Sequence, residues 1–433
     1  MQVLKKGNNY IFTFLITVVC LMGMLVCSAM IPRKMLKDNI EESAIYLCEG
    51  ELFAYMVDGV NGSKVDRYAD SILLAIAYQY DSEKPLTSVM WSSYYFSKYQ
   101  NENENLLDAV TKELEPNQQY LRYWHGSNSI VRPLLVVFNI KQIYMLNGIL
   151  LTGLAIALLT VLIRRKAYAP AIGMLAGLIG VGCWFVTFSL EYSWTFFVML
   201  IISLVGVIQT YKCNAKKLGV QFLICGMLTN YLDFLTTETI TLTVPLLLVL
   251  WIEQSKAGYE GIQCLIKTAG KLTVCWSCGY IGMWVMKWGI ASIVLGENIM
   301  PYVSQHIGER IGGNLGLGPL QFIWGAIWNN IRCIFPLEYG IIGLMIGFCL
   351  ILLIIYTGYV YHASSIDSKM ILLYVLVGMI PYIRYIVLHN HSYVHYFFTY
   401  RAQVATILAI CLIWEKITDR RWPVNANKRK RRA

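Results

Sequence analysis

An acidic stretch from Asp66 to Asp70 carries the clearest candidate chemistry in this chain of 433 residues. Asp66 and Asp70 are four positions apart, so they share one face if this region is helical. A half-buried carboxylate can act as a general base that removes the proton of a hydroxyl. The stretch also fits a structural role, in which Asp70 caps or starts a helix while Asp66 pairs with Arg67 in water. Asp70 is the first candidate for a catalytic base and Asp66 the second.

Arginine and histidine side chains supply the complementary positive charge. The candidates are, in chain order, Arg122, His125, Arg384, His391, His395 and Arg401. A guanidinium fork matches the oxygens of a phosphate, so these side chains are candidates for binding a phosphorylated substrate. The alternatives are contact with lipid headgroups for Arg122 and snorkelling to the interface for Arg384 and Arg401. A cation inside an apolar run is costly, however, and this favours a functional role.

Asp233 belongs to a polar turn between two apolar runs that are short for full membrane spans, and it is a further candidate for substrate binding. These runs are expected to form two short helices that meet below the outer surface, beside protein or a water-filled cavity. The histidines at positions 389, 391 and 395 raise the alternative of a metal site. No zinc-type spacing or clear carboxylate partner accompanies them, so no cofactor is assigned, and a divalent metal stays an open alternative.

The elements that position these residues are membrane helices. Hydrophobic residues make up 57% of the chain and charged residues only 14%, with a mean hydropathy of +0.52. Soluble proteins contain about 45–50% apolar and about 25% charged residues. The apolar residues gather into runs of about 20, which is the length that spans a bilayer. The composition therefore excludes a soluble enzyme, a disordered chain and a collagen-like protein.

The runs predict an all-α polytopic membrane protein with about ten transmembrane helices. Residues 1–31 form an N-terminal anchor helix, and residues 143–414 form a multi-helix bundle. Between them, residues 32–142 form a largely helical extracytoplasmic loop. The predicted spans are Tyr10–Ile31, Ile143–Ile163, Tyr168–Leu190, Ser193–Gln209, Leu218–Leu235, Glu238–Ile252, Lys271–Leu295, Tyr339–Tyr361, Met370–Leu388 and Val394–Trp414.

Charge placement predicts the orientation of the chain. Residues 32–132 hold 15 acidic against 10 basic residues, although the whole chain has a net charge of +10. Basic clusters flank the apolar runs, and residues 415–433 form a basic tail. This positive-inside pattern predicts a cell-membrane protein with both termini in the cytoplasm, and it explains the basic charge without a nucleic-acid partner. The segment Phe138–Asn147 is expected to be an amphipathic helix at the interface.

The order of these parts resembles the GT-C superfamily of integral-membrane glycosyltransferases, in particular the bacterial members that use polyprenyl-phosphate sugars. The likeness in architecture covers nearly the whole chain, and several segments look like parts of uncharacterised bacterial multi-pass membrane proteins. These segments are Val65–Asp70, Arg122–Gly126, Arg132–Leu135, Asn230–Thr236 and Asn390–Arg401. The family often has an adjacent acidic pair in its first outer loop, whereas Asp66 and Asp70 are separated here.

The resemblance implies an inverting transfer of a hexose or pentose from a lipid-linked donor to a cell-envelope glycan, lipid or protein. Asp70 or Asp66 would activate the acceptor hydroxyl, while cationic residues near the outer interface hold the carrier phosphate. Membrane lipids would surround the protein. Two alternatives are a transporter or flippase of lipid-linked glycans, and a polymerase or ligase of such glycans. A purely structural protein is favoured if the candidate residues are scattered in space.

Overall fold

The computed structural model describes residues 2–212, 215–256, 261–311, 318–364 and 366–418, so the end of the basic tail lies outside the described residues. The described chain is built from helices α1 to α20 and short 3-10 segments. Within it, β-pairing is limited to isolated bridges such as that between Tyr55 and Lys64. The predicted all-α class is therefore confirmed.

Seven helical segments in the described residues are long and apolar enough to cross a membrane, which identifies a multi-pass membrane protein. They are Asn9–Ala29 in α1 (Gln2–Ala29), α7 (Ile140–Arg164), α9 (Leu190–Tyr211), α12 (Ile262–Leu295), α15 (Gly340–Val360), Ser368–Val387 over α16 (Ser368–Gly378) and α17 (Ile380–Val387), and Tyr396–Ile417 up to the end of α20 (Val404–Ile417). Two shorter apolar helices, α8 (Tyr168–Gly180) and α11 (Ile240–Gln254), lie among them. The predicted number of about ten exceeds the seven long helices.

Two predicted spans are broken by local backbone chemistry. The run Tyr168–Leu190 leaves the α-helix after Gly180 because Gly182 adopts a φ of +57°, and a 3-10 segment, Cys183–Phe188, follows. The run Met370–Leu388 changes from α16 to α17 around Met379, and Pro381 lies in the first turn of α17. Each break divides a predicted span into two shorter helical segments.

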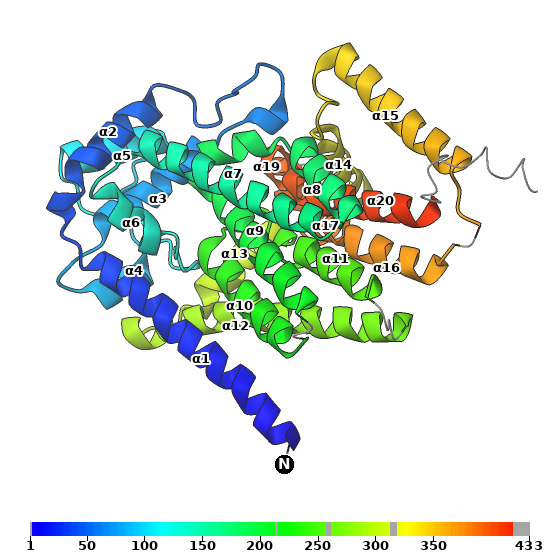
Figure 1. Cartoon of the computed structure of the whole chain (residues 1–433). Coiled ribbons are helices and arrows are strands. Elements are labelled where there is room, and N and C mark those ends of the chain that lie inside the picture. The colour runs from blue at the N-terminus through cyan, green and yellow to red at the C-terminus, as the bar shows by residue number, and fades with distance from the viewer. Residues whose placement is uncertain (1, 213–214, 257–260, 312–317, 365, 419–433) are drawn as a thin grey trace, which may run out of the picture.

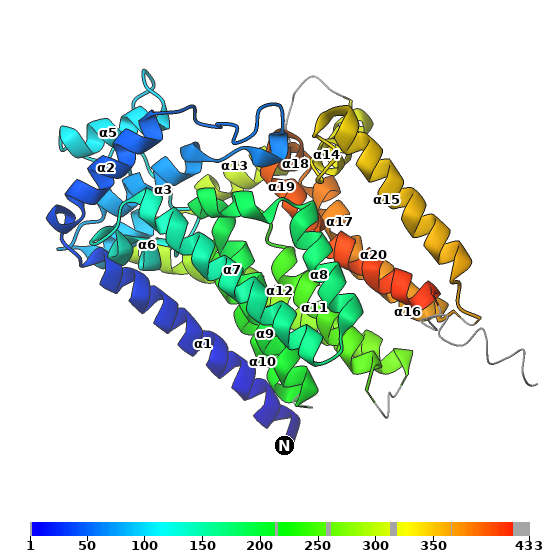
Figure 2. The same ribbon diagram turned by 45° about the horizontal axis from the view of Figure 1, so that its top comes forward.

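Residues between the first two long helices form a separate group of short helices at one end of the bundle (Figures 1 and 2). The group is called the outer helical region below, after its predicted extracytoplasmic location, and contains α2 (Lys37–Cys48), α3 (Arg67–Gln79), α4 (Pro85–Trp91), α5 (Glu102–Thr111) and α6 (Asn128–Leu135). Instead of a separate interface helix, residues 140–147 form the first turns of α7. Asn139 caps this helix through reciprocal bonds with Gln142, which fixes its start.

Two buried cations attach the outer helical region to the bundle. Arg132 in α6 donates to the carbonyl oxygens of Ala77 near the end of α3, at 2.7 Å, and of Ser28 near the end of α1. Lys287 in α12 donates to the carbonyl oxygens of Val89 and Met90 in α4, each at 3.1 Å. The last carbonyl groups of a helix lack intrahelical hydrogen-bond donors and carry partial negative charge. A cation at this end donates hydrogen bonds to these carbonyl groups and also neutralises their charge.

The remaining helices follow α9 in the chain. α10 (Ala215–Leu232) runs beside α12 and meets α11 at a polar turn, as expected for this pair of short helices. α18 (His389–Val394) and α19 (Tyr396–Thr399) precede a 3-10 turn, Tyr400–Gln403, and α20. The helices α13 (Met300–Ile311) and α14 (Pro319–Arg332) pack against α18. The expected span Val394–Trp414 therefore begins with short, irregular elements.

Candidate functional site

One cavity of about 210 Å³ brings together acidic, cationic and aromatic side chains from distant parts of the chain. Asp66 comes from the start of α3, Arg122 and His125 from the segment before α6, Glu191 from α9 and His391 from α18. The rest of the lining consists of Phe53, Tyr68, Ala69, Ile72, Leu73, Tyr120, Phe234, His395 and Phe398. The fold thus joins the acidic candidate Asp66 to four of the predicted cationic candidates.

Asp66 begins α3 and reaches the cavity. Its Oδ1 atom accepts the backbone N–H of Ala69 at 2.8 Å, so it is the N-cap of this helix. Its carboxyl group is also hydrogen-bonded to the carboxyl group of Glu191, with Glu191 as the donor. Two carboxylates would repel each other, so the pair must hold a proton. Burial raises the pKa of Asp66 to about 6, which keeps this carboxyl poised between its two protonation states near neutral pH.

Asp70 lies behind the cavity wall and is fully buried. It accepts the backbone N–H groups of Leu190 at 2.9 Å and Glu191 at 3.3 Å, and the hydroxyls of Ser189 and Tyr144 also donate to it. Burial raises the pKa of Asp70 to about 7, in opposition to these donors. Asp70 therefore caps the start of α9 and positions Glu191. The geometry favours Asp66, the second sequence candidate, for contact with a substrate.

Arg122 and His125 form a polar wall held by aromatic rings. The Arg122 guanidinium lies 4.2 Å from the centre of the Tyr120 ring and 5.2 Å from that of Tyr123. His125 Nε2 is 2.8 Å from the carbonyl oxygen of Tyr120, which can only accept, so Nε2 carries the proton. Burial lowers the pKa of His125 to about 3. The ring is therefore neutral, and its buried Nδ1 has no hydrogen-bond partner.

His125 also has a left-handed backbone, with a φ of +51°. Such a conformation is uncommon for residues other than glycine, although histidine adopts it more often than most, and it is often found at functional sites. The neighbouring Trp124 is buried and donates its indole N–H to the carbonyl oxygen of Met283 in α12 at 2.9 Å. This anchor and the contact between Gly126 and Tyr231 fix the strained segment against the bundle. The unpartnered Nδ1 acceptor is thus presented by a rigid backbone.

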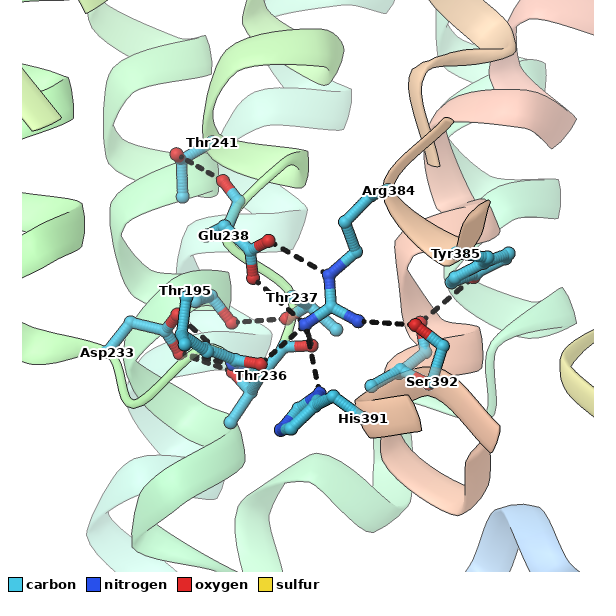
Figure 3. A network of polar contacts seen from close by, with 12 residues as sticks. Thr195, Asp233, Thr236, Thr237, Glu238, Thr241, Arg384, Tyr385, His391 and Ser392 are labelled. Atoms are coloured by element: carbon cyan, nitrogen blue, oxygen red, sulfur yellow. Dashed lines mark hydrogen bonds and ion pairs between the residues drawn. The ribbon is translucent and has the colours of Figure 1, made fainter. Parts of the chain in front are cut away.

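Arg384 is not part of the cavity lining and makes a network of polar contacts with neighbouring residues (Figure 3). Its Nε atom donates to Glu238 at 2.9 Å, and its terminal nitrogens donate to the carbonyl oxygen of Leu235 at 2.6 Å and to the hydroxyl of Ser392 at 3.0 Å. The guanidinium also lies 3.4 Å from Nδ1 of His391. Because a guanidinium only donates, Nδ1 accepts and the ring proton resides on Nε2. Arg384 therefore fixes the orientation of His391.

Asp233 stabilises the polar turn between α10 and α11 (Figure 3). It accepts the backbone N–H of Thr236 at 3.1 Å and the hydroxyl of the same residue. Leu235 in this turn has a φ of +68°. The next residue after Asp233, Phe234, lines the cavity, whereas Asp233 does not. Asp233 therefore shapes the site through the turn that carries Phe234.

His395 and Arg401 have different positions relative to the cavity. The His395 ring lines the cavity and is stacked on Phe398, with 5.2 Å between the ring centres. Arg401 is buried outside the lining and donates to the carbonyl oxygens of Gly62 at 3.0 Å and Phe397 at 3.3 Å. Its guanidinium lies 4.4 Å from the centre of the Tyr192 ring. Arg401 thus attaches the loop before α3 to the C-terminal helices.

Within the described residues, no group of three or more His, Cys, Asp and Glu side chains is placed to hold a metal ion. Glu191 is the cavity residue that the sequence did not single out for chemistry. The signal in the sequence is an acid at the start of an apolar run, two residues after Ser189. Comparisons with protein-family models, curated proteins and solved structures found no match to this chain.

Proposed function

We propose that this protein is a membrane glycosyltransferase that moves a sugar from a polyprenyl-phosphate carrier to a cell-envelope acceptor on the outer face. One observation carries the proposal: a hydrogen-bonded carboxyl pair, Asp66 and Glu191, shares a cavity with Arg122 and His391. Acid, base and phosphate-binding groups are the components that this transfer needs. The resemblance noted in the sequence points to the same class.

In the proposed reaction, the ionised Asp66 takes the proton of the acceptor hydroxyl. The oxygen then forms a bond to the anomeric carbon of the sugar, and the bond from that carbon to the phosphate oxygen breaks. The bonding electrons leave on the carrier phosphate, whose growing negative charge Arg122 would stabilise. His391, which carries its ring proton on Nε2, would donate to the sugar or phosphate. Attack opposite the leaving phosphate inverts the anomeric centre.

The aromatic lining suits a sugar substrate. Tyr68 stacks on Phe53 with 5.9 Å between ring centres and 22° between ring planes, and both line the cavity. Aromatic faces bury the apolar face of a pyranose while its hydroxyls remain available for hydrogen bonds. Five aromatic side chains are part of the lining, namely Phe53, Tyr68, Tyr120, Phe234 and Phe398.

The test compares envelope glycans and lipid-linked sugars from gene-deleted cells that express the original chain, Asp66→Asn or Asp58→Asn. Asp58 is an exposed acid of the same outer region and is the matched control. We expect the glycan of the deleted cells to lack one sugar. The original chain and Asp58→Asn should both restore this sugar. Asp66→Asn should accumulate the lipid-linked donor at a normal protein level. An unchanged glycan pattern in all cells would reject the transferase, and a donor confined to the inner leaflet would favour a flippase.

A further inference from the structure

The loop before α3 is a hairpin that carries two residues of the cavity lining. It extends over residues 52–67, and the backbone N–H of Val65 on its second arm donates to the carbonyl oxygen of Ala54 on its first arm at 3.0 Å. Phe53 lies on the first arm and Asp66 on the second, and both line the cavity. The segment is called the cavity hairpin below. Its position sets the position of both side chains.

The cavity hairpin is closed by hydrogen bonds at its base and at its tip. At the base, the Arg67 guanidinium donates to the carbonyl oxygen of Leu47 in α2 at 2.9 Å. At the tip, the Ser63 hydroxyl donates to the carbonyl oxygen of Val60 at 2.8 Å and accepts the backbone N–H of Val57 at 3.0 Å. The tip contacts α19 across the outer end of the bundle (Figures 1 and 2). Because the hairpin is closed at both ends, a displacement of its tip is transmitted to its arms.

Glu338, in the connection between α14 and α15, binds this tip with both oxygens of its carboxylate. Oε1 accepts the side-chain N–H of Asn61 at 2.8 Å, and Oε2 accepts the backbone N–H of Gly62 at 2.8 Å. Oδ1 of Asn61 also accepts the hydroxyl of Tyr396 at 3.0 Å. Hydrogen bonds to an ionised carboxylate are about twice as strong as those between neutral groups. Glu338 is thus a strong link between the hairpin tip and the C-terminal part of the bundle.

The tip also covers Cys333 at the end of α14. Cys333 is buried, and its Sγ atom lies 3.5 Å from Oε1 of Glu338. A Cβ added at Gly62 would lie 3.2 Å from the carbonyl oxygen of Cys333, so the tip packs directly on this residue. A buried thiol reacts slowly with alkylating reagents. Release of the tip should therefore increase the reactivity of Cys333.

We propose that Glu338 is a positioning residue for the cavity, because it holds the cavity hairpin and so keeps Asp66 and Phe53 in the cavity wall. Glu338 is not one of the described residues that line the cavity, so it acts through the hairpin. Phe53 packs edge-on against Phe397 of α19, with 5.4 Å between the ring centres, and a shifted hairpin would break this contact. The inference rests on the proposed function in one respect, since it takes Asp66 as the base of the transfer.

Release of the tip is measured with the full-length protein in nanodiscs, as the rate at which a maleimide alkylates Cys333. Peptide mass spectrometry separates this thiol from the other cysteines. Asn61→Asp places a second carboxylate against Glu338, so we expect alkylation to become at least fivefold faster. The double variant Asn61→Asp with Glu338→Gln restores an N–H donor that faces a carboxylate, with the polarity reversed, and should return to the original rate. Unchanged rates in both Asn61→Asp and Glu338→Ala would overturn the proposal.

Two controls separate this effect from a general loss of structure. Cys48 in α2 is half-buried and lies outside the hairpin, so its alkylation rate should not change in any variant. Asn117→Asp is the matched substitution, because Asn117 in the same outer region donates its side-chain N–H to the carbonyl oxygen of Phe96 at 2.9 Å. It should leave the alkylation of Cys333 unchanged. Equal increases at Cys48 and Cys333 in Asn61→Asp would contradict the proposal, because they would report unfolding of the whole region.

Transfer by the same variants is measured in the gene-deleted cells, as the amount of envelope sugar restored at a normal protein level. Asn61→Asp should restore at least tenfold less sugar than the original chain, and the double variant should restore as much as the original chain. Full transfer by Asn61→Asp together with rapid alkylation of Cys333 would show that the hairpin does not position the site. Asp66→Asn should lose transfer with an unchanged alkylation rate. Should Asp66→Asn transfer normally, the proposed function would fail, whereas the alkylation rates would still decide whether Glu338 holds the hairpin.

Discussion

The carboxyl groups of Asp66 and Glu191 are hydrogen-bonded to each other, although one begins a helix of the outer region and the other begins a membrane-spanning helix. The contact requires a proton between two acids that both line the cavity. Asp70 accepts the backbone N–H of Glu191 at 3.3 Å, so the position of Glu191 depends on it. The contacts of Asp66 and Asp70 with Glu191 thus link the outer helical region to the bundle.

The carboxyl pair predicts unequal effects of two conservative substitutions. Asp66→Asn removes the proposed base, and we expect transfer to fall by about 10² to 10⁴. Glu191→Gln keeps a hydrogen-bond donor toward Asp66, so the loss should be at least tenfold smaller. Initial rates of carrier-phosphate release from a lipid-linked sugar measure both effects. Equal losses in the two variants would contradict the assignment of Asp66 as the base.

The pKa of Asp66 predicts the pH dependence of transfer. The base must be ionised, and burial raises its pKa to about 6. Activity should therefore fall as the pH decreases through about 6 and reach a plateau above about 7. The rate is measured between pH 5 and pH 8 in nanodiscs, with the folded fraction checked at each pH by size-exclusion chromatography. A flat profile for folded protein would exclude a titrating base of this kind.

Asp70 is expected to matter for stability. Asp70→Ala leaves the buried N–H groups of Leu190 and Glu191 without an acceptor, at a cost of about 1–3 kcal/mol each. Asp367→Ala is the control, because Asp367 caps α16 through the N–H of Met370 but is exposed. Thermal unfolding in detergent should show a clearly larger decrease for Asp70→Ala. Equal decreases in the two variants would contradict the role of Asp70 as a buried cap.

The sequence predicted the seven long apolar helices because apolar runs of about 20 residues are typical of burial in lipid, but three further predicted spans, Tyr168–Leu190, Leu218–Leu235 and Glu238–Ile252, are not among these seven. It could not predict where such runs break, since the bend at Gly182 and the change of helix near Pro381 depend on single residues and their neighbours. The sequence also could not predict which of Asp66 and Asp70 reaches the cavity. Both positions lie at the start of α3, and only the packing of α9 decides which side chain reaches the cavity.

The sequence predicted which cations are buried but not which groups they contact. Arg384 was predicted to bind substrate, and in the structure it contacts the side chains of Glu238, Ser392 and His391 and the backbone carbonyl of Leu235. From sequence alone, a cation in an apolar run has no assignable partner, because its partner lies on a distant helix. His391, also predicted to bind substrate, lines the cavity, and its orientation could not be predicted without its contact with Arg384.

Arg384 predicts a strong stability effect with a specific rescue. Arg384→Met leaves the buried Glu238 without its cation, and we expect a loss of about 3–5 kcal/mol. The double variant Arg384→Met with Glu238→Gln should recover part of this loss, because no unpaired charge remains. Lys256→Met breaks the more exposed pair with Glu253 and should cost about 0–1 kcal/mol. Unfolding measurements that give equal losses for Arg384→Met and Lys256→Met would contradict this role of the pair.

The substitution Arg401→Lys distinguishes a structural role of this residue from a substrate-binding role. Its guanidinium donates to Gly62 and Phe397 and lies on Tyr192, so it fixes the loop before α3 against the C-terminal helices. Arg401→Lys replaces a planar fork with a single ammonium group that cannot reach both carbonyls in the same geometry. We therefore expect a smaller amount of folded protein and faster proteolysis between residues 56 and 64. Arg33→Lys, at a more exposed cation of the outer region, is the control. Normal folding of Arg401→Lys with a selective loss of donor binding would instead make Arg401 a phosphate ligand.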